Sequence, residues 1–230
     1  VGTSSDTLAQ AFRYLLPPGE EPGRWETLTN LSTPLGEVAA GVIAGVLYLV
    51  GEGSSATLAY DAQNRQWLAN KATRPFVGHH HAAEVLGGKL YLVGGLGGGS
   101  EGRLQIYDPA TNSWTTGASL PWSGGSLATV VIGGQLYAAG GIVSTFTVAN
   151  CARYDPVTNS WTNRASMPDG GRNHAAAATD GSKLFVFGGR RGGNFPSNGY
   201  DSLMLYDPAT NAWTWSGEVG STLAPLPEAR

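Results

Sequence analysis

The sequence has little of what would identify several common classes of protein. Among 230 residues there is one cysteine, Cys151, so no intrachain disulfide can form and the redox compartment stays open. Charged residues make up only 13% of the chain, and just three of the basic ones are lysines. No apolar run approaches the ~18 residues of a membrane-spanning helix. The sequence therefore predicts no disulfide framework and no membrane insertion.

The charge balance argues against a nucleic-acid partner. The formal net charge is −3, from 14 basic and 17 acidic residues, without a basic stripe or a block of like charge. Residues 1–24 also lack the basic start and continuous apolar core of an intact signal peptide, although a mature secreted chain would look the same. From the low-lysine composition, rich in glycine, threonine and asparagine, we expect a secreted or periplasmic protein of bacterial type, with a cytoplasmic location left open.

What the sequence does contain is a repeat, best seen in residues 87–114. It runs through an apolar strand, paired glycines, a variable loop, a second strand ending in Tyr-Asp-Pro, a tight turn and a tryptophan. The same order returns at 44–67, 133–161 and 181–213, and the tyrosine always lies seven residues before the tryptophan. A fixed offset within units that are joined by loops of varying length indicates repeated supersecondary structure.

Each unit is expected to form four short strands. In the second unit the first strand is predicted at 81–85 and the next at 90–93, separated by the Gly87-Gly88 turn. The turn PATNS then leads from Tyr-Asp-Pro into the strand that carries the tryptophan, because proline presets φ and asparagine tolerates the left-handed conformation.

Paired glycines followed by tyrosine and tryptophan at fixed spacing, in units of roughly 50 residues, resemble the kelch repeat. The resemblance covers residues 25–230 and implies an all-β, kelch-type β-propeller of four-stranded antiparallel blades, with residues 1–24 as a leader outside the repeat. Four complete blades are expected, at about 36–70, 79–117, 126–164 and 173–216.

The ends of the chain suggest an incomplete ring, because kelch propellers commonly have more than four blades. Trp25 is predicted to mark an orphan N-terminal strand, and the tail TLAPLPEAR matches residues 165–172, which precede a first strand. The hypothesis is a fragment of a larger propeller. A partner chain, such as a second copy, is the alternative way to complete the ring, and a cooperative monomer would require the four blades to close on themselves.

Kelch propellers usually bind through the face formed by the loops that join strands two to three and four to one. We call this the loop face; its segments are 51–57, 94–103, 140–148 and 188–201, with 68–80, 115–126 and 162–173. The longest loop carries a candidate site for a carboxylate, a phosphate or an acidic peptide. Its residues are Arg190, Arg191, Asn194, Tyr200 and Asp201. Solvated arginines in a loop without function are the alternative.

The run His79-His80-His81 raises the question of a metal. Consecutive strand residues point to opposite sides, so at most His79 and His81 share an ion, and no metal or cofactor is expected. In the alignment of the repeats His81 matches His174, a position that often carries histidine in kelch blades, which favours a structural role. His79 and His80 are predicted to line the mouth of a pocket, together with Arg74 and Arg172.

Two further residues stand out. Cys151 occupies the position of Leu104 and Leu203 in other units, so we expect a buried core thiol. Trp122 lies in a loop, outside the tryptophan pattern, and either stacks on a ligand such as a sugar or plugs a local hydrophobic gap.

No nucleophile elbow, Walker loop or zincin motif occurs, and the glycine-rich runs join strand to strand, which disfavours nucleotide binding. The expected function is non-catalytic recognition of a protein segment or a carbohydrate on the loop face. The alternatives are a sugar-processing enzyme that resembles the kelch-fold sialic acid mutarotases, or the recognition domain of a larger secreted enzyme.

Overall fold

The computed structural model describes residues 28–31, 33–192 and 199–229. The chain divides into two compact units, Val1–Asn30 and Leu31–Arg230, and the strands below all belong to the second. No helix in the described ranges is long and apolar enough to cross a membrane. The predicted leader, its boundary at residue 25 and the strand at Trp25 lie outside the described residues.

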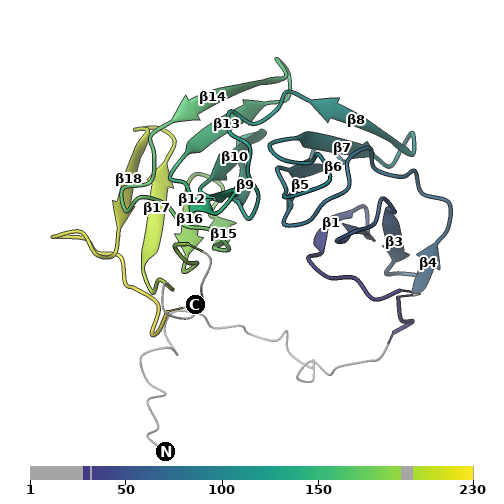
Figure 1. Cartoon of the computed structure of the whole chain (residues 1–230), viewed down its shortest axis with the longest axis horizontal. Helices are drawn as coiled ribbons and strands as arrows, with labels where there is room; N and C mark the ends of the chain where they lie inside the picture. The colour runs from purple at the N-terminus through teal and green to yellow at the C-terminus, as the bar shows by residue number, and fades with distance from the viewer. Residues whose placement is uncertain (1–27, 32, 193–198, 230) are drawn as a thin grey trace, which may run out of the picture. The chain divides into compact units, whose positions relative to one another are not determined.

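Four antiparallel sheets of four strands follow one another along the chain (Figure 1). The first contains β1 (Ala39–Ile43), β2 (Val46–Val50), β3 (Leu58–Asp61) and β4 (Gln66–Leu68). The second contains β5 (Ala82–Leu86), β6 (Lys89–Val93), β7 (Leu104–Asp108) and β8 (Ser113–Gly117). The all-β fold of four-stranded blades is confirmed.

The third sheet has an insertion. It contains β9 (Ala128–Ile132), β10 (Gln135–Ala139), β13 (Cys151–Asp155) and β14 (Ser160–Arg164). Between β10 and β13 a small hairpin is formed by β11 (Ile142–Val143) and β12 (Phe146–Thr147), which leaves Phe146 73% exposed on the loop face. The fourth sheet contains β15 (Ala176–Thr179), β16 (Leu184–Phe187), β17 (Leu203–Asp207) and β18 (Ala212–Trp215).

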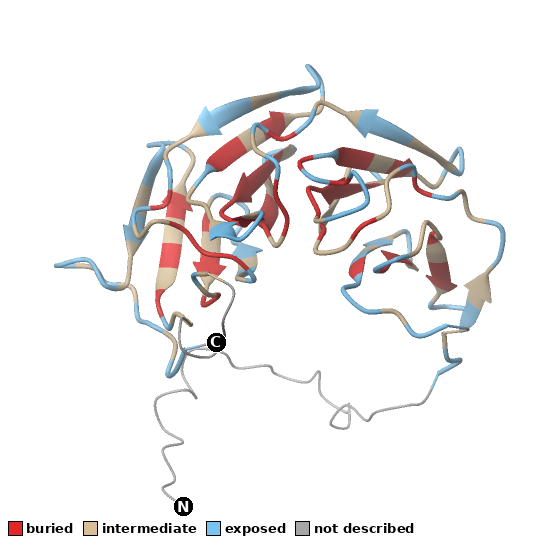
Figure 2. Ribbon diagram, in the orientation of Figure 1, coloured by how far each residue is buried: buried red, intermediate tan, exposed pale blue. Residues whose placement is uncertain are grey.

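Both faces of a sheet are used for packing. In β6, Leu90 and Leu92 pack in the core shared with the first sheet, whereas Tyr91 and Val93 pack in the core shared with the third. Successive strand residues point to opposite faces, so this alternation places apolar side chains on both sides. Buried residues concentrate on the two middle strands of the sheets, such as β6, β7, β10 and β13, while the outermost strands β8 and β14 contain no buried residue (Figure 2).

A tyrosine, an asparagine and a tryptophan join each of the last three sheets to the sheet before it. In the second sheet, Asn112 Oδ1 accepts hydrogen bonds from the Tyr107 hydroxyl (2.7 Å) and from the backbone N–H of Ala72 (2.9 Å). The indole of Trp114 donates back to the Ala72 carbonyl at 3.1 Å. Since Ala72 belongs to the connection that leaves the first sheet, these contacts tie neighbouring blades together; we call them the Tyr–Asn–Trp clamp.

The clamp recurs at the next two junctions. Its members there are Tyr154, Asn159 and Trp161 with Ala118, and Tyr206, Asn211 and Trp213 with Ala165. The first sheet lacks the asparagine, because Arg65 occupies its position, and the buried Tyr60 hydroxyl has no hydrogen-bond partner among the described residues. In each clamp the asparagine and the tryptophan thus bind the same alanine of the neighbouring connection, while the tyrosine donates to the asparagine.

The paired glycines lie where backbones and side chains crowd. At Gly95 a Cβ atom would come within 2.5 Å of the His81 ring, and the φ of +139° disfavours other residues as well. The second glycines of the next two pairs, Gly141 and Gly189, meet Leu127 and Ala175 in the same way. The glycine pair therefore sets how closely strand two approaches the start of strand one.

The outer face of the fourth sheet is apolar and only partly covered by the described residues. Phe185 and Phe187 stack with ring centroids 6.4 Å apart and are half-buried, although Tyr91 and Val93 at the matching positions of β6 are buried. The segment that follows β18 makes a contact that is also found after the third sheet. The N–H of Leu226 donates to the carbonyl of Asp201, just as the N–H of Met167 donates to the carbonyl of Ala149. Completion of the ring by further blades or a partner chain stays a prediction.

The clamp can be tested by removing single hydroxyl groups. Tyr154→Phe deletes a buried hydrogen bond to Asn159, so we expect the free energy of unfolding to fall by about 0.5–1.5 kcal/mol. Tyr60→Phe deletes a buried hydroxyl that has no described partner and should be neutral or slightly stabilising. Urea unfolding followed by tryptophan fluorescence measures both variants, and equal losses would show that the asparagine contributes nothing.

A buried carboxyl group makes stability depend on pH. Burial raises the pKa of Glu84 to about 7. The hydroxyl of Thr129 donates to Glu84 Oε1 at 2.9 Å, and this hydrogen bond acts in the opposite direction by lowering the pKa. The folded-state pKa of Glu84 lies above the unfolded one, so folding is favoured while Glu84 is protonated. This contribution to the free energy of unfolding is fully present below the unfolded pKa and is lost as the pH rises through about 7. Glu84→Gln should remove this loss, about 1–3 kcal/mol between pH 5 and 8 in urea titrations, whereas the exposed control Glu218→Gln should keep it.

Candidate functional site

Four residues occupy the same position in the four sheets and share an unusual backbone conformation. Glu37, His80, Ser126 and His174 each lie two residues before the first paired alanine of the innermost strand. Their φ angles are 44°, 58°, 56° and 53°, in the left-handed region that residues with a Cβ seldom adopt. We call them the ring residues; all lie on the loop face, where the chain enters strands β1, β5, β9 and β15.

Backbone hydrogen bonds between sheets hold three of the ring residues in place. The N–H of Ser126 donates to the carbonyl of His80 at 2.8 Å, and the N–H of His174 donates to the carbonyl of Ser126 at 3.3 Å. Successive blades are thus linked at the loop face as well as through the clamps. The left-handed conformations are maintained by these contacts between blades.

The side chains of the ring residues meet one another. His80 Nε2 lies 3.5 Å from Glu37 Oε2, and the rings of His80 and His174 pack edge to face with centroids 5.0 Å apart. His79 Nδ1 makes a short contact with His80 Nδ1. The ring residues and His79 therefore form one polar cluster.

Arg190 completes the cluster. Its Nη2 lies 3.3 Å from His174 Nε2, which is also 3.4 Å from the Ser126 hydroxyl. His174 Nδ1 lies 2.5 Å from Asn173 Oδ1, so Nδ1 carries the hydrogen and Nε2 presents its lone pair to Arg190 and Ser126. Asn173 is buried, and its amide nitrogen is fixed by the Thr147 hydroxyl of the β11–β12 hairpin at 2.7 Å.

Partial burial favours the neutral form of two histidines of the cluster, His80 and His174. It is the largest cause that lowers the pKa of His80 and of His174. Arg190 lowers the pKa of both further, while Glu37 raises both. At neutral pH the guanidinium of Arg190 and the side chain of Glu37 therefore lie beside two uncharged imidazoles, those of His80 and His174. In the described ranges no group of three or more His, Cys, Asp or Glu side chains could hold a metal ion.

The alignment of His81 with His174 was wrong by one residue. The register places Ala175 at the position of His81, and His174 at the position of His80. His81 is buried instead: its Nδ1 donates to the Gly94 carbonyl at 2.6 Å, its Nε2 accepts from Arg74, and burial lowers its pKa to about 4. The structural role inferred for both histidines thus describes His81, whereas His174 lies in the cluster.

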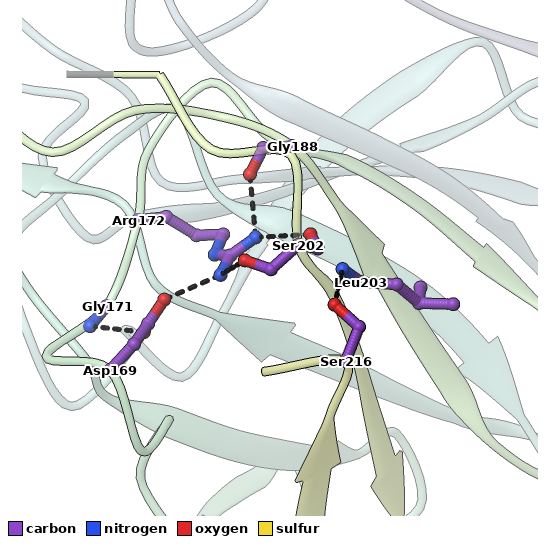
Figure 3. Close-up of polar contacts among 7 residues, drawn as sticks. All are labelled: Asp169, Gly171, Arg172, Gly188, Ser202, Leu203 and Ser216. Carbon is purple, nitrogen blue, oxygen red and sulfur yellow. Dashed lines mark hydrogen bonds and ion pairs between the residues drawn. The ribbon is translucent and has the colours of Figure 1, made fainter. Parts of the chain in front are cut away.

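The two arginines predicted at the pocket mouth lie in the protein interior. Arg74, 2% exposed, donates to the carbonyls of Gly51 and Gly78 and contacts His81. Arg172, 1% exposed, donates to the carbonyls of Gly188 and Ser202 at 2.9 Å and forms an ion pair with Asp169 at 2.5 Å (Figure 3). Both arginines donate to loop carbonyl groups in the protein interior, so neither belongs to the cluster of ring residues.

The remaining candidates are scattered. Tyr200 covers the Arg172 guanidinium with its ring at 4.4 Å, and the exposed Asp201 lies beside it in sequence. The Arg191 guanidinium lies beside Gly170, where its Nη2 would be 2.9 Å from an added Cβ. Trp122 packs against the core between the second and third sheets. Asn194 lies outside the described residues, and Cys151 is buried with a pKa raised to about 12 by burial.

Of the predicted site residues, the structure brings together His79, His80 and Arg190. Sequence reasoning missed Glu37, Ser126 and His174, although a signal was available. Each ring residue lies fourteen residues before the first glycine that follows strand two, at Gly51, Gly94, Gly140 and Gly188. Aligning the repeats on these glycines, rather than on the sequence His-Ala-Ala that begins at His81 and at His174, identifies all four ring residues.

Comparison with known families fits this architecture. The kelch motif matches residues 78–121, 124–168 and 171–214, together more than half of the chain. The chain belongs to the kelch-repeat family. These three matches correspond to the second, third and fourth blades, and kelch-repeat proteins generally bind protein partners.

The similar proteins are longer than this chain. It is 28% identical over 120 residues to Kelch-like protein terF of Aspergillus terreus, covering 44% of this chain and 26% of the relative. It is 33% identical over 104 residues to Kelch-like protein 38 of Danio rerio, covering 42% of this chain and 16% of the relative. The structure of YjhT aligns with a TM-score of 0.71 at 20% identity, over 87% of this chain and 68% of that one, which shows the fold.

The buried Arg172, at the start of the fourth blade, can be tested directly. Arg172→Ala leaves the Asp169 carboxylate and two carbonyl groups without their donor, so the free energy of unfolding should fall by about 3–5 kcal/mol. Arg191→Ala, at an exposed arginine of the same face, should change it by less than about 0.5 kcal/mol. Thermal and urea unfolding measure both, and similar small effects would contradict the bracing role of Arg172.

Proposed function

We propose that this kelch protein is a non-catalytic recognition module that binds a segment of a partner protein on its loop face, centred on the ring residues. The observation that carries the proposal is that one strained backbone conformation recurs in four blades with the side chains Glu, His, Ser and His. The backbone is the same each time, and the chemistry presented differs.

Glycine would satisfy this backbone better than any of the four residues. A left-handed conformation costs a residue with a Cβ roughly 1–2 kcal/mol, whereas glycine adopts it freely. The chain uses 34 glycines, many of them in turns with positive φ, yet it has none at these positions. Side chains retained despite their cost, and clustered on one exposed face, favour a binding role.

The exposed Phe146 adds an apolar contact on the same face. The hairpin that carries it is tied to the cluster, because the Thr147 hydroxyl accepts from Asn173 and from the N–H of Gly192 at 2.8 Å. A large aromatic side chain on a fixed support is typical of residues that dominate protein interfaces. The opposite face carries the similar PATNS turns, whose asparagines are engaged in the clamps.

The proposal is tested by selecting peptides from a random display library and measuring their affinity by fluorescence anisotropy. The double variant His80→Gly/His174→Gly removes two side chains from a backbone that suits glycine, so the fold is retained. It should bind at least about tenfold more weakly, a loss of ~1.4 kcal/mol. Val157→Ala, which alters a residue of the opposite turns that is 91% exposed, should leave affinity unchanged. Failure to select peptides, or equal binding by all three proteins, would overturn the proposal.

A further inference from the structure

We infer that the cluster on the loop face binds a carboxylate group of the partner, received by Arg190 and Ser126, with His174 adding a donor when its ring is protonated. This inference rests on the proposed function for the class of partner, and it adds the chemistry that the partner must present. Three polar groups from the third and fourth blades converge at one point, since His174 Nε2 lies 3.3 Å from Arg190 Nη2 and 3.4 Å from Ser126 Oγ.

Arg190 is held in position, and among the described residues no carboxylate lies within ion-pair distance of it. Its backbone N–H and C=O are both paired with Asn173 at 2.9 Å, and its Nε lies 3.4 Å from Asn173 Oδ1. Its side-chain contacts within the described residues are thus neutral acceptors, whereas Arg172, Lys89 and Lys183 each lie within ion-pair distance of an aspartate. A half-buried, pre-oriented guanidinium of this kind suits a planar carboxylate, which accepts two parallel hydrogen bonds.

Glu37 provides an internal comparison. Its carboxylate already lies 3.5 Å from His80 Nε2 in the same cluster, which shows that the histidines accommodate a carboxylate oxygen. The charges of Glu37 and Arg190 act in opposite directions on the same two histidines, since Glu37 raises the pKa of His80 and of His174 and Arg190 lowers it. The two residues should therefore affect the binding of an external carboxylate in opposite directions.

Binding should also strengthen as the pH falls. Arg190 opposes protonation of both histidines and Glu37 favours it. At His80, His79 also opposes protonation and Glu52 favours it, and at His174 protonation is also opposed by His80. A bound carboxylate adds a further negative charge and favours the protonated imidazole, whose Nε2 would then donate. By linkage, binding takes up a proton, and affinity should rise between about pH 7.5 and pH 5.5.

The first experiment uses sodium glutarate as a probe. Its binding is followed by NMR of histidine side chains in the wild type and in variants with intact melting temperatures. Arg190→Gln should weaken binding about tenfold or more, while the adjacent Arg191→Gln, which makes the same change in charge, should alter it less than about twofold. Glu37→Gln should strengthen binding. Equal effects of the two arginine substitutions, or weakening by Glu37→Gln, would overturn the inference.

The second experiment uses the selected peptides. Replacing their aspartate or glutamate residues by the amides, and separately amidating their C-terminus, identifies which carboxylate is bound; one change should weaken binding about tenfold. Peptides that depend on the ring residues but not on any carboxylate would overturn this inference and leave the proposed function standing. Arg190-dependent binding of glutarate without any selected peptide would support the carboxylate site and overturn the proposed function.

Discussion

Each four-stranded sheet of this protein has two apolar faces, so it depends on its neighbours for burial. The alternation in β6 shows this directly, because Leu90 and Leu92 pack toward the first sheet while Tyr91 and Val93 pack toward the third. Burial of such side chains stabilises each by about 1.5–3 kcal/mol, but only when the next blade is present. The arrangement of the blades is therefore a condition of stability as well as a consequence of the repeat.

The Tyr–Asn–Trp clamp makes this packing specific. Apolar faces alone would permit sliding, whereas Asn112 must receive both the Tyr107 hydroxyl and the N–H of Ala72 from the neighbouring connection. A buried polar group without its partner is costly, so the correct register is favoured over nearby ones. At the loop face the backbone bonds from Ser126 to His80 and from His174 to Ser126 fix the same registration. The strained ring residues are maintained because the blades are held at both edges.

Much of the fold was readable from the repeat, because short-range patterns specify it. The spacing of tyrosine to tryptophan predicted the paired strands, and the sheets fall within the ranges expected for the blades. The site was less readable. His79, His80 and Arg190 were identified because histidine and arginine in loops are common ligand-binding residues. Glu37 and Ser126 belong to no motif in the sequence, so nothing local singled them out. Arg74 and Arg172 were predicted to line the mouth of a pocket, although the structure buries both among carbonyl oxygens.

The sequence by itself determined the kelch repeat, the four-stranded blades and the division between similar turns and variable loops. Those features follow from local rules: alternation of side chains, turn chemistry and glycine where space is lacking. Only the tertiary structure decided which loop residues meet, because Glu37, His80, Ser126 and His174 are far apart along the chain and come together through packing between blades. It also decided which arginines are exposed, since burial depends on what the neighbouring blade provides and no local pattern records that.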